Sequence, residues 1–208
     1  MISIYLEVLI LSMVQGISEF LPVSSSAHLI VFSNIINFSN KSIIFDVGLH
    51  LGSLLAIIFY FKKELLNISN DKKLLYLLLI GSIPLILVGY IFYSTGIINS
   101  FRNLNIIAWT TLIFGILMYF ADTFKIKKNI EKDLTIKNIL IIGILQVLAI
   151  IPGVSRAGIT ITAGRFLNFD RHDSTKISFY LSIPALMGAS FLSLKDAVNE
   201  NLEFNLFL

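Results

Sequence analysis

Apolar runs alternate with short polar stretches along the whole chain. Four of these runs, 43–61, 74–93, 103–121 and 177–195, are each 19 or 20 residues long. A helix of about 20 apolar residues spans the roughly 30 Å hydrocarbon core of a bilayer. The pattern therefore predicts four full transmembrane helices, one of them with a kink at Pro84 that neighbouring helices tolerate.

Two further stretches are broken in the middle. Residues 2–17 and 25–36 flank a polar cluster, and residues 138–151 and 156–168 flank a Pro-Gly turn. Residues 2–17 would form a helix of only about 24 Å, which is too short for a full crossing. Each pair predicts a re-entrant hairpin that enters and leaves the membrane by the same face. For the first pair, a single span kinked at Pro22 is the alternative.

Composition agrees with a membrane protein. Hydrophobic residues make up 56% and charged residues 14% of the 208 positions, whereas a soluble domain typically has about 25% charged residues. The mean hydropathy is +0.84. We therefore expect residues 1–208 to form a single membrane domain. The net charge of +3 does not indicate nucleic-acid binding, because the charges lie in short loops. The absence of cysteine excludes disulfides and cysteine-ligated metals.

Lysine and arginine gather in three loops. The loops 62–73, 122–137 and 165–176 contain 12 of the 16 basic residues, so the positive-inside rule places them in the cytoplasm. The first hairpin then opens outward and the second opens toward the cytoplasm. This is an inverted-topology repeat, with repeat 1 at about 1–93 and repeat 2 at about 103–208. The predicted fold class is an all-α integral membrane protein with two re-entrant hairpins and about four full transmembrane helices.

The second break carries the strongest single signal. An arginine within an apolar stretch, such as Arg156, costs at least a few kcal/mol unless it is paired. It follows Ser155, which can cap the next helix, and helix N-termini and guanidinium groups both bind phosphate. Thr160, one turn later, can orient Arg156. We predict an anion site where the two breaks meet; the alternative is a structural ion pair between Arg156 and Glu19.

The first break supplies the chemical groups for such a site. Glu19 is a general base, a metal ligand or a counter-ion, and Gln15 lies one helical turn before it. The three serines at 24–26 begin the next half-helix, so one is an N-cap and the others are a nucleophile or phosphate donors. His28 is expected to be an acid–base or nucleophilic group.

Other polar residues have weaker interpretations. Asp46, His50 and Ser53 lie four and three positions apart on the 43–61 span. They support the site, line a path to it, or only pack helices together. Three charged residues are interpreted as cytoplasmic loop charge: Arg165, Arg171 and His172.

Two stretches resemble the signature motifs of the undecaprenyl-diphosphatases, the bacitracin-resistance phosphatases. They are Gln15-x-x-x-Glu19-Phe-Leu-Pro-Val-Ser-Ser-Ser-Ala-His28 and Pro152-Gly-Val-Ser-Arg156-x-x-x-Thr160. The run Asp46-Val-Gly-Leu-His-Leu-Gly-Ser53 is similar to that family's following helix. The two motifs in this order and spacing are highly specific, and the resemblance covers residues 1 to about 196.

The resemblance implies a multi-pass enzyme of the cell (inner) membrane. It would hydrolyse undecaprenyl diphosphate to the monophosphate, recycle this lipid carrier for cell-wall synthesis and give bacitracin resistance. It implies that Ser25 or His28 is the nucleophile and that Arg156 holds the phosphate, with Glu19 as ligand of a divalent cation, Mg²⁺ or Ca²⁺. We favour Ser25 as the nucleophile, with His28 or Glu19 assisting. Further substrate contacts are expected from four residues: Ser24, Ser26, Ser155 and Thr160. The remaining residues, Gln15, Asp46 and His50, are expected to support the site.

The chain departs from the family pattern at two places. Gln15 stands at the first acidic position of the motif, so any metal site loses a charge. Family members also continue with two further membrane helices after the span ending near 195, whereas this sequence ends at Leu208. A short natural member, a truncated gene product and a homo-oligomer that covers the exposed surface are the alternatives. The rival functions are a lipid-phosphate transporter or flippase, which would not need the serine, histidine and glutamate cluster, and a non-catalytic membrane assembly protein.

Overall fold

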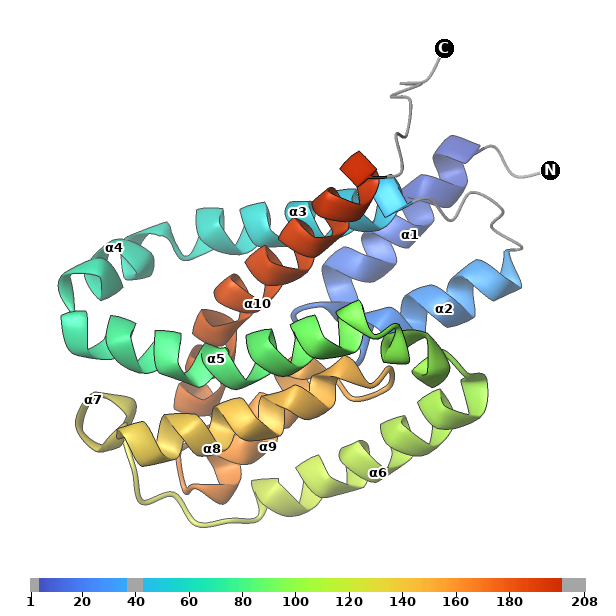
Figure 1. Ribbon diagram of the computed structural model, residues 1–208. Coiled ribbons are helices and arrows are strands. Elements are labelled where there is room, and N and C mark those ends of the chain that lie inside the picture. The colour runs from blue at the N-terminus through green and yellow to red at the C-terminus, as the bar shows by residue number, and fades with distance from the viewer. Residues whose placement is uncertain (1–3, 37–42, 200–208) are drawn as a thin grey trace.

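The structure is a computed structural model, and it describes residues 4–36 and 43–199. Within these residues the chain is helical, with one isolated β-bridge between Lys128 and Phe169 (Figure 1). The helices in chain order are α1 (Ile4–Ser18), α2 (Ser25–Ile35), α3 (Ile43–Tyr60), α4 (Lys62–Asn70), α5 (Lys72–Ser94), the 3-10 helix η1 (Ile97–Phe101), α6 (Leu104–Asp122), α7 (Ile130–Asp133), α8 (Ile136–Gln146), the 3-10 helix η2 (Val147–Ile150), α9 (Arg156–Phe166) and α10 (Arg171–Asn199).

The predicted long runs are all helices. Among the described residues, α5 and α6 are long and apolar enough to cross a membrane by length and composition alone. The run predicted at 177–195 lies within α10, which begins earlier, at Arg171, and so includes charged residues. The loop predicted at 62–73 contains the short helix α4, whose polar and apolar residues lie on opposite sides.

Both interrupted runs turn back on themselves. α1 ends at Ser18 and α2 begins at Ser25, while η2 ends at Ile150 and α9 begins at Arg156. α1 packs against α2, and α8 packs against α9 (Figure 1). The second turn depends on Gly153, whose φ of +94° is a conformation that side chains with a Cβ rarely adopt. Two short helices joined by a polar turn are therefore present at each predicted break.

Helices α5 and α8 touch through their backbones. A Cβ on Gly143 would lie 2.1 Å from the carbonyl oxygen of Gly81, and a Cβ on Gly81 would lie 2.6 Å from the Ile139 side chain. Only glycine permits this approach at both positions. The same helices supply Leu77, Leu78 and Ile142 to the main buried cluster, to which α4, α7, α9 and α10 also contribute. This packing fixes α8, and with it the start of the second break, against α5.

The three loops rich in lysine and arginine lie at one end of the bundle. A cavity of about 250 Å³ is lined by Glu64, Glu131 and Lys176, one residue from each of the three predicted loops. The β-bridge between Lys128 and Phe169 also joins two of them. In Figure 1, α4 and α7 lie at the same end, away from η1. The loops predicted to share one side of the membrane are thus neighbours in space.

Arg165 does not lie in a loop, contrary to its interpretation as cytoplasmic loop charge. It lies in the last turn of α9, and only 4% of it is exposed. Its guanidinium donates to the carbonyl oxygens of Phe169 (2.5 Å), Asp122 (2.9 Å) and Phe124 (2.7 Å). These carbonyls follow the ends of α9 and α6, where helices leave carbonyl groups without partners. Arg171 is exposed as predicted, and it binds the Asp122 carboxylate.

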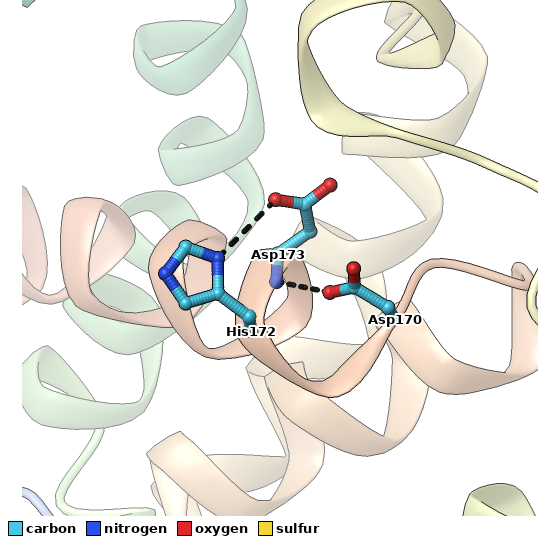
Figure 2. Close-up of side chains that lie close together, drawn as sticks. All are labelled: Asp170, His172 and Asp173. Carbon is cyan, nitrogen blue, oxygen red and sulfur yellow. Dashed lines mark hydrogen bonds and ion pairs between the residues drawn. The ribbon is translucent and has the colours of Figure 1, made fainter.

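Figure 2 shows Asp170, His172 and Asp173 at the start of α10. Asp170 accepts a hydrogen bond from the backbone N–H of Asp173 (2.6 Å) and so caps this helix. The buried Asp173 carboxylate accepts one from the N–H of Ile130 (2.8 Å), at the start of α7. His172 is exposed, as the loop interpretation predicts, and lies 3.7 Å from Asp173. Backbone capping therefore accounts for both carboxylates of this cluster.

Candidate active site

Ser24 joins the two breaks. It is the N-cap of α2, and its hydroxyl oxygen accepts hydrogen bonds from the N–H groups of Ala27 (3.3 Å) and Gly153 (3.1 Å). The Ser26 hydroxyl lies 3.2 Å away. A hydroxyl has two acceptor positions and one proton, so these three contacts occupy the buried Ser24 side chain. Its position favours a structural role at the junction over the predicted contact with substrate.

An ion pair spans the junction. Glu19 follows the last residue of α1, and Arg156 is the first residue of α9. Arg156 Nη2 donates to Glu19 Oε1 over 2.9 Å, and the two side chains are 13% and 9% exposed. Residues 137 positions apart therefore meet at the predicted place. The contact fits both earlier interpretations, because a guanidinium held by one carboxylate still has donors left for an anion.

Ser25 binds the other carboxylate oxygen of Glu19. Its hydroxyl donates to Glu19 Oε2 over 2.6 Å. The Gln15 amide donates to the same oxygen over 3.2 Å and lies 3.5 Å from the Ser53 hydroxyl on α3. A hydroxyl that donates to a carboxylate is the arrangement of an activated nucleophile beside its base. Of the three serines at 24–26, only Ser25 is placed in this way.

His28 has a defined tautomer but no hydrogen bond to Glu19 or Ser25 among the described residues. Its Nδ1 lies 2.7 Å from the carbonyl oxygen of Ser24. A carbonyl only accepts, so Nδ1 carries the proton and Nε2 keeps its lone pair. The side chain is exposed, one turn into α2. Nε2 is therefore available to an incoming group, although the proposed acid–base partnership is not made in this structure.

The Arg156 guanidinium also contacts α10. Its Nη1 donates to the carbonyl oxygen of Ser178 over 3.2 Å. The Thr160 hydroxyl lies 2.9 Å from the Arg156 carbonyl and 2.8 Å from the Ser178 hydroxyl. Thr160 is fully buried, which favours a role in orienting Arg156, and its predicted contact with substrate stays a prediction. Ser155 is likewise buried, as the N-cap of α9.

Sequence reasoning missed Ser178, although a signal was present. Ser174, Ser178 and Ser182 recur every four residues along α10, and all three are buried. Such a row of small residues lets helices approach closely in a membrane. At Ser174, α10 approaches α9 closely, because a Cβ on Gly164 would lie 2.7 Å from the Ser174 hydroxyl oxygen.

The remaining predicted residues are peripheral or undetermined. Ser26 is exposed and contacts Ser24. His50 is half-buried on α3, three residues before Ser53, and its role stays a prediction. Asp46 lies in the same helix, but its side chain is outside what the structure describes.

The cluster suits a divalent cation in its donor chemistry. Mg²⁺ and Ca²⁺ bind carboxylate and amide oxygens. The amide oxygen of Gln15 is buried and has no hydrogen-bond partner, which is unusual for such a group. The Glu19 carboxylate accepts three hydrogen bonds and has about four acceptor positions. Gln15 and Glu19 are therefore the residues that fit the predicted metal.

Comparison with known proteins agrees with the motifs. Residues 8–207 match the family model described as bacitracin resistance protein BacA. An undecaprenyl-diphosphatase of Pelagibacter ubique is 59% identical over 206 residues, which cover 99% of this chain and 80% of the relative. Undecaprenyl-diphosphatases of Elusimicrobium minutum and Alteromonas mediterranea are 42% and 38% identical, over 90% and 94% of this chain and 75% and 78% of theirs. The chain therefore belongs to the bacitracin resistance protein BacA family.

Proposed function

We propose that the protein is an undecaprenyl-diphosphate phosphatase, which hydrolyses undecaprenyl diphosphate to undecaprenyl phosphate and phosphate. This reaction recycles the lipid carrier for cell-wall synthesis and accounts for bacitracin resistance. The relatives, which are undecaprenyl-diphosphatases, support the assignment. The observation that carries it is the contact of Ser25, Glu19 and Arg156, because phosphoryl transfer needs a nucleophile, a proton acceptor and a cation together.

Substrate binding and activation are coupled in this arrangement. A terminal phosphate competes with Glu19 for the Arg156 guanidinium, which binds phosphate with two parallel donors. When Arg156 turns to the phosphate, Glu19 Oε1 is released from the ion pair, while Oε2 still accepts from the Ser25 hydroxyl. Phosphate binding thus frees the carboxylate to take the Ser25 proton.

The chemical step follows from these positions. Glu19 takes the Ser25 proton as Oγ bonds to the terminal phosphorus, and the bond from that phosphorus to the bridging oxygen breaks. Undecaprenyl phosphate leaves, and water then attacks the phosphorus of the phosphoserine. The bond from phosphorus to Ser25 Oγ breaks, Glu19 returns its proton to Oγ, and phosphate is released. His28 Nε2, with its free lone pair, accepts the proton of that water. A divalent cation held by Glu19 and Gln15 would neutralise phosphate charge when bound.

The finer fold prediction belongs with this proposal. One membrane domain with an inverted repeat places the two hairpin turns together within the inner membrane, with the prenyl chain in lipid. The neighbouring loops rich in lysine and arginine and the helix pairs α1–α2 and α8–α9 support it.

Phosphate release from undecaprenyl diphosphate, measured on detergent-purified protein with and without Mg²⁺ or Ca²⁺, tests the function. Ser25→Ala and Arg156→Ala should each lower turnover by about a thousandfold or more. Ser33→Ala is the matched control, because the Ser33 hydroxyl donates to its own helix at Ile30. Turnover that survives Ser25→Ala would remove serine as the nucleophile. Movement of intact substrate across vesicles without phosphate release would favour the flippase.

A further inference from the structure

The turn of the second break lies directly against the middle of α6. The Thr110 hydroxyl is 2.8 Å from the carbonyl oxygen of Pro152, and the Thr111 hydroxyl is 3.4 Å from that of Gly153. A Cβ on Gly153 would lie 2.0 Å from Thr110 Oγ1 and 2.7 Å from the Ile107 carbonyl oxygen. No side chain fits between the turn and α6, so the two threonines meet the backbone itself.

These two carbonyl groups depend on the threonines. Pro152 and Gly153 are buried, and no backbone N–H in the described part of the chain donates to either carbonyl. A buried carbonyl without a donor costs free energy comparable to a lost hydrogen bond, and lipid offers no replacement. Thr110 also lies 2.8 Å from the Ile106 carbonyl oxygen and 3.1 Å from that of Ile107, but both of these groups have helical N–H partners of their own.

The rest of α6 makes the placement of the threonines specific. From Ile106 to Met118, Thr110 and Thr111 are the only hydroxyl-bearing side chains. Most of this helix is exposed and apolar, as suits contact with lipid. A hydroxyl there is useful only where it finds an acceptor.

We propose that Thr110 and Thr111 are positioning residues for Arg156, and the inference rests on the proposed function. Together with Ser24 they form a clamp on the turn, because Ser24 binds the Gly153 N–H while the threonines bind the carbonyls on its other side. Arg156 begins α9 three residues later. The clamp therefore fixes where the guanidinium stands relative to Glu19 and Ser25.

Thr110→Val tests the clamp, since valine keeps the shape and removes the hydroxyl. We expect kcat for phosphate release to fall about ten- to a hundredfold, the range for a lost supporting contact, with KM changed by less than about threefold. Thr110→Ser should restore most of the rate. Thr95→Val is the matched control, because the exposed Thr95 hydroxyl contacts carbonyls of its own helix. A Thr110→Val enzyme with wild-type kcat, or a serine variant as slow as the valine variant, overturns the proposal.

Hydrogen exchange followed by mass spectrometry provides a readout that is independent of activity. In Thr110→Val the amides of 153–156 should exchange faster, while those of α5 and α8 stay protected. Unchanged exchange at 153–156 contradicts the clamp. If Thr110→Val does not fold, Thr111→Val, which loses the longer contact, replaces it in both assays. If wild-type protein releases no phosphate, the proposed function fails, and the exchange result alone decides whether the clamp exists.

Discussion

Removing both charges of the Glu19–Arg156 pair should cost less stability than the two single losses added together. The variants that test this are Glu19→Gln, Arg156→Met and the double variant. Each single change leaves the other charge in a site where the side chains are only 9% and 13% exposed. A buried charge without a partner is more costly than two neutral groups of similar size. The double variant should therefore be more stable than the two single losses predict.

The magnitude follows from the geometry. Unit charges about 4 Å apart attract by about 4 kcal/mol at an effective dielectric constant of about 20, and desolvation offsets part of this. Loss of one partner should cost about 3 to 5 kcal/mol, which lowers Tm by roughly 10 °C in a chain of this length. We expect a coupling free energy of about 2 to 3 kcal/mol between the two sites.

Thermal unfolding of the four proteins in one detergent measures this coupling. Arg171→Ala is the control, because the Arg171 side chain is 77% exposed where it pairs with Asp122. Its loss should lower the free energy of unfolding by about 1 kcal/mol or less. Single losses that add to the double loss within about 0.5 kcal/mol would refute the reasoning, since the charges would then be solvated independently.

Three further predictions concern other residues of the site and its supports. Gln15→Glu adds a carboxylate beside Glu19 and should tighten Mg²⁺ binding about tenfold, measured as the Mg²⁺ dependence of Tm. Gly153→Ala should abolish folding or lower Tm sharply, because its Cβ would lie 2.0 Å from Thr110 Oγ1, whereas a Cβ on Gly16 of α1 meets no atom within 4 Å. Arg165→Met should lose about 3 kcal/mol or more of stability in unfolding assays, since three carbonyl groups lose their donor; wild-type Tm would contradict the burial of this side chain.

The sequence predicts those parts of the fold and of the site that follow from one large free-energy cost. Run length separates half-helices from full ones, and Pro152-Gly153 marks the second turn because few residue pairs interrupt an apolar helix so effectively. An arginine and a glutamate in apolar surroundings each need a partner of opposite charge, so each is the natural partner of the other. Their contact is therefore foreseeable from composition and position.

The supporting contacts escape such reasoning because their signals are ordinary. Arg165 near the end of a helix looks like loop charge, and its burial depends on carbonyl groups at the end of α6, more than 40 residues away. Ser178 and Thr110 look like common helix residues, since the backbone groups they meet belong to other elements. The helix α4 is too short and polar for an apolar pattern to indicate it.

The contact between Gly81 and Gly143 also limits how the lipid reaches the site. Where a single added carbon would collide with a carbonyl at 2.1 Å, no isoprenoid chain can slip between α5 and α8. The entrance for a long, flexible hydrocarbon must lie on another flank. The sides of α1 at Gly16 and of α3 at Gly48 and Gly52 are not closed in this way, because a Cβ there would meet no atom within 4 Å.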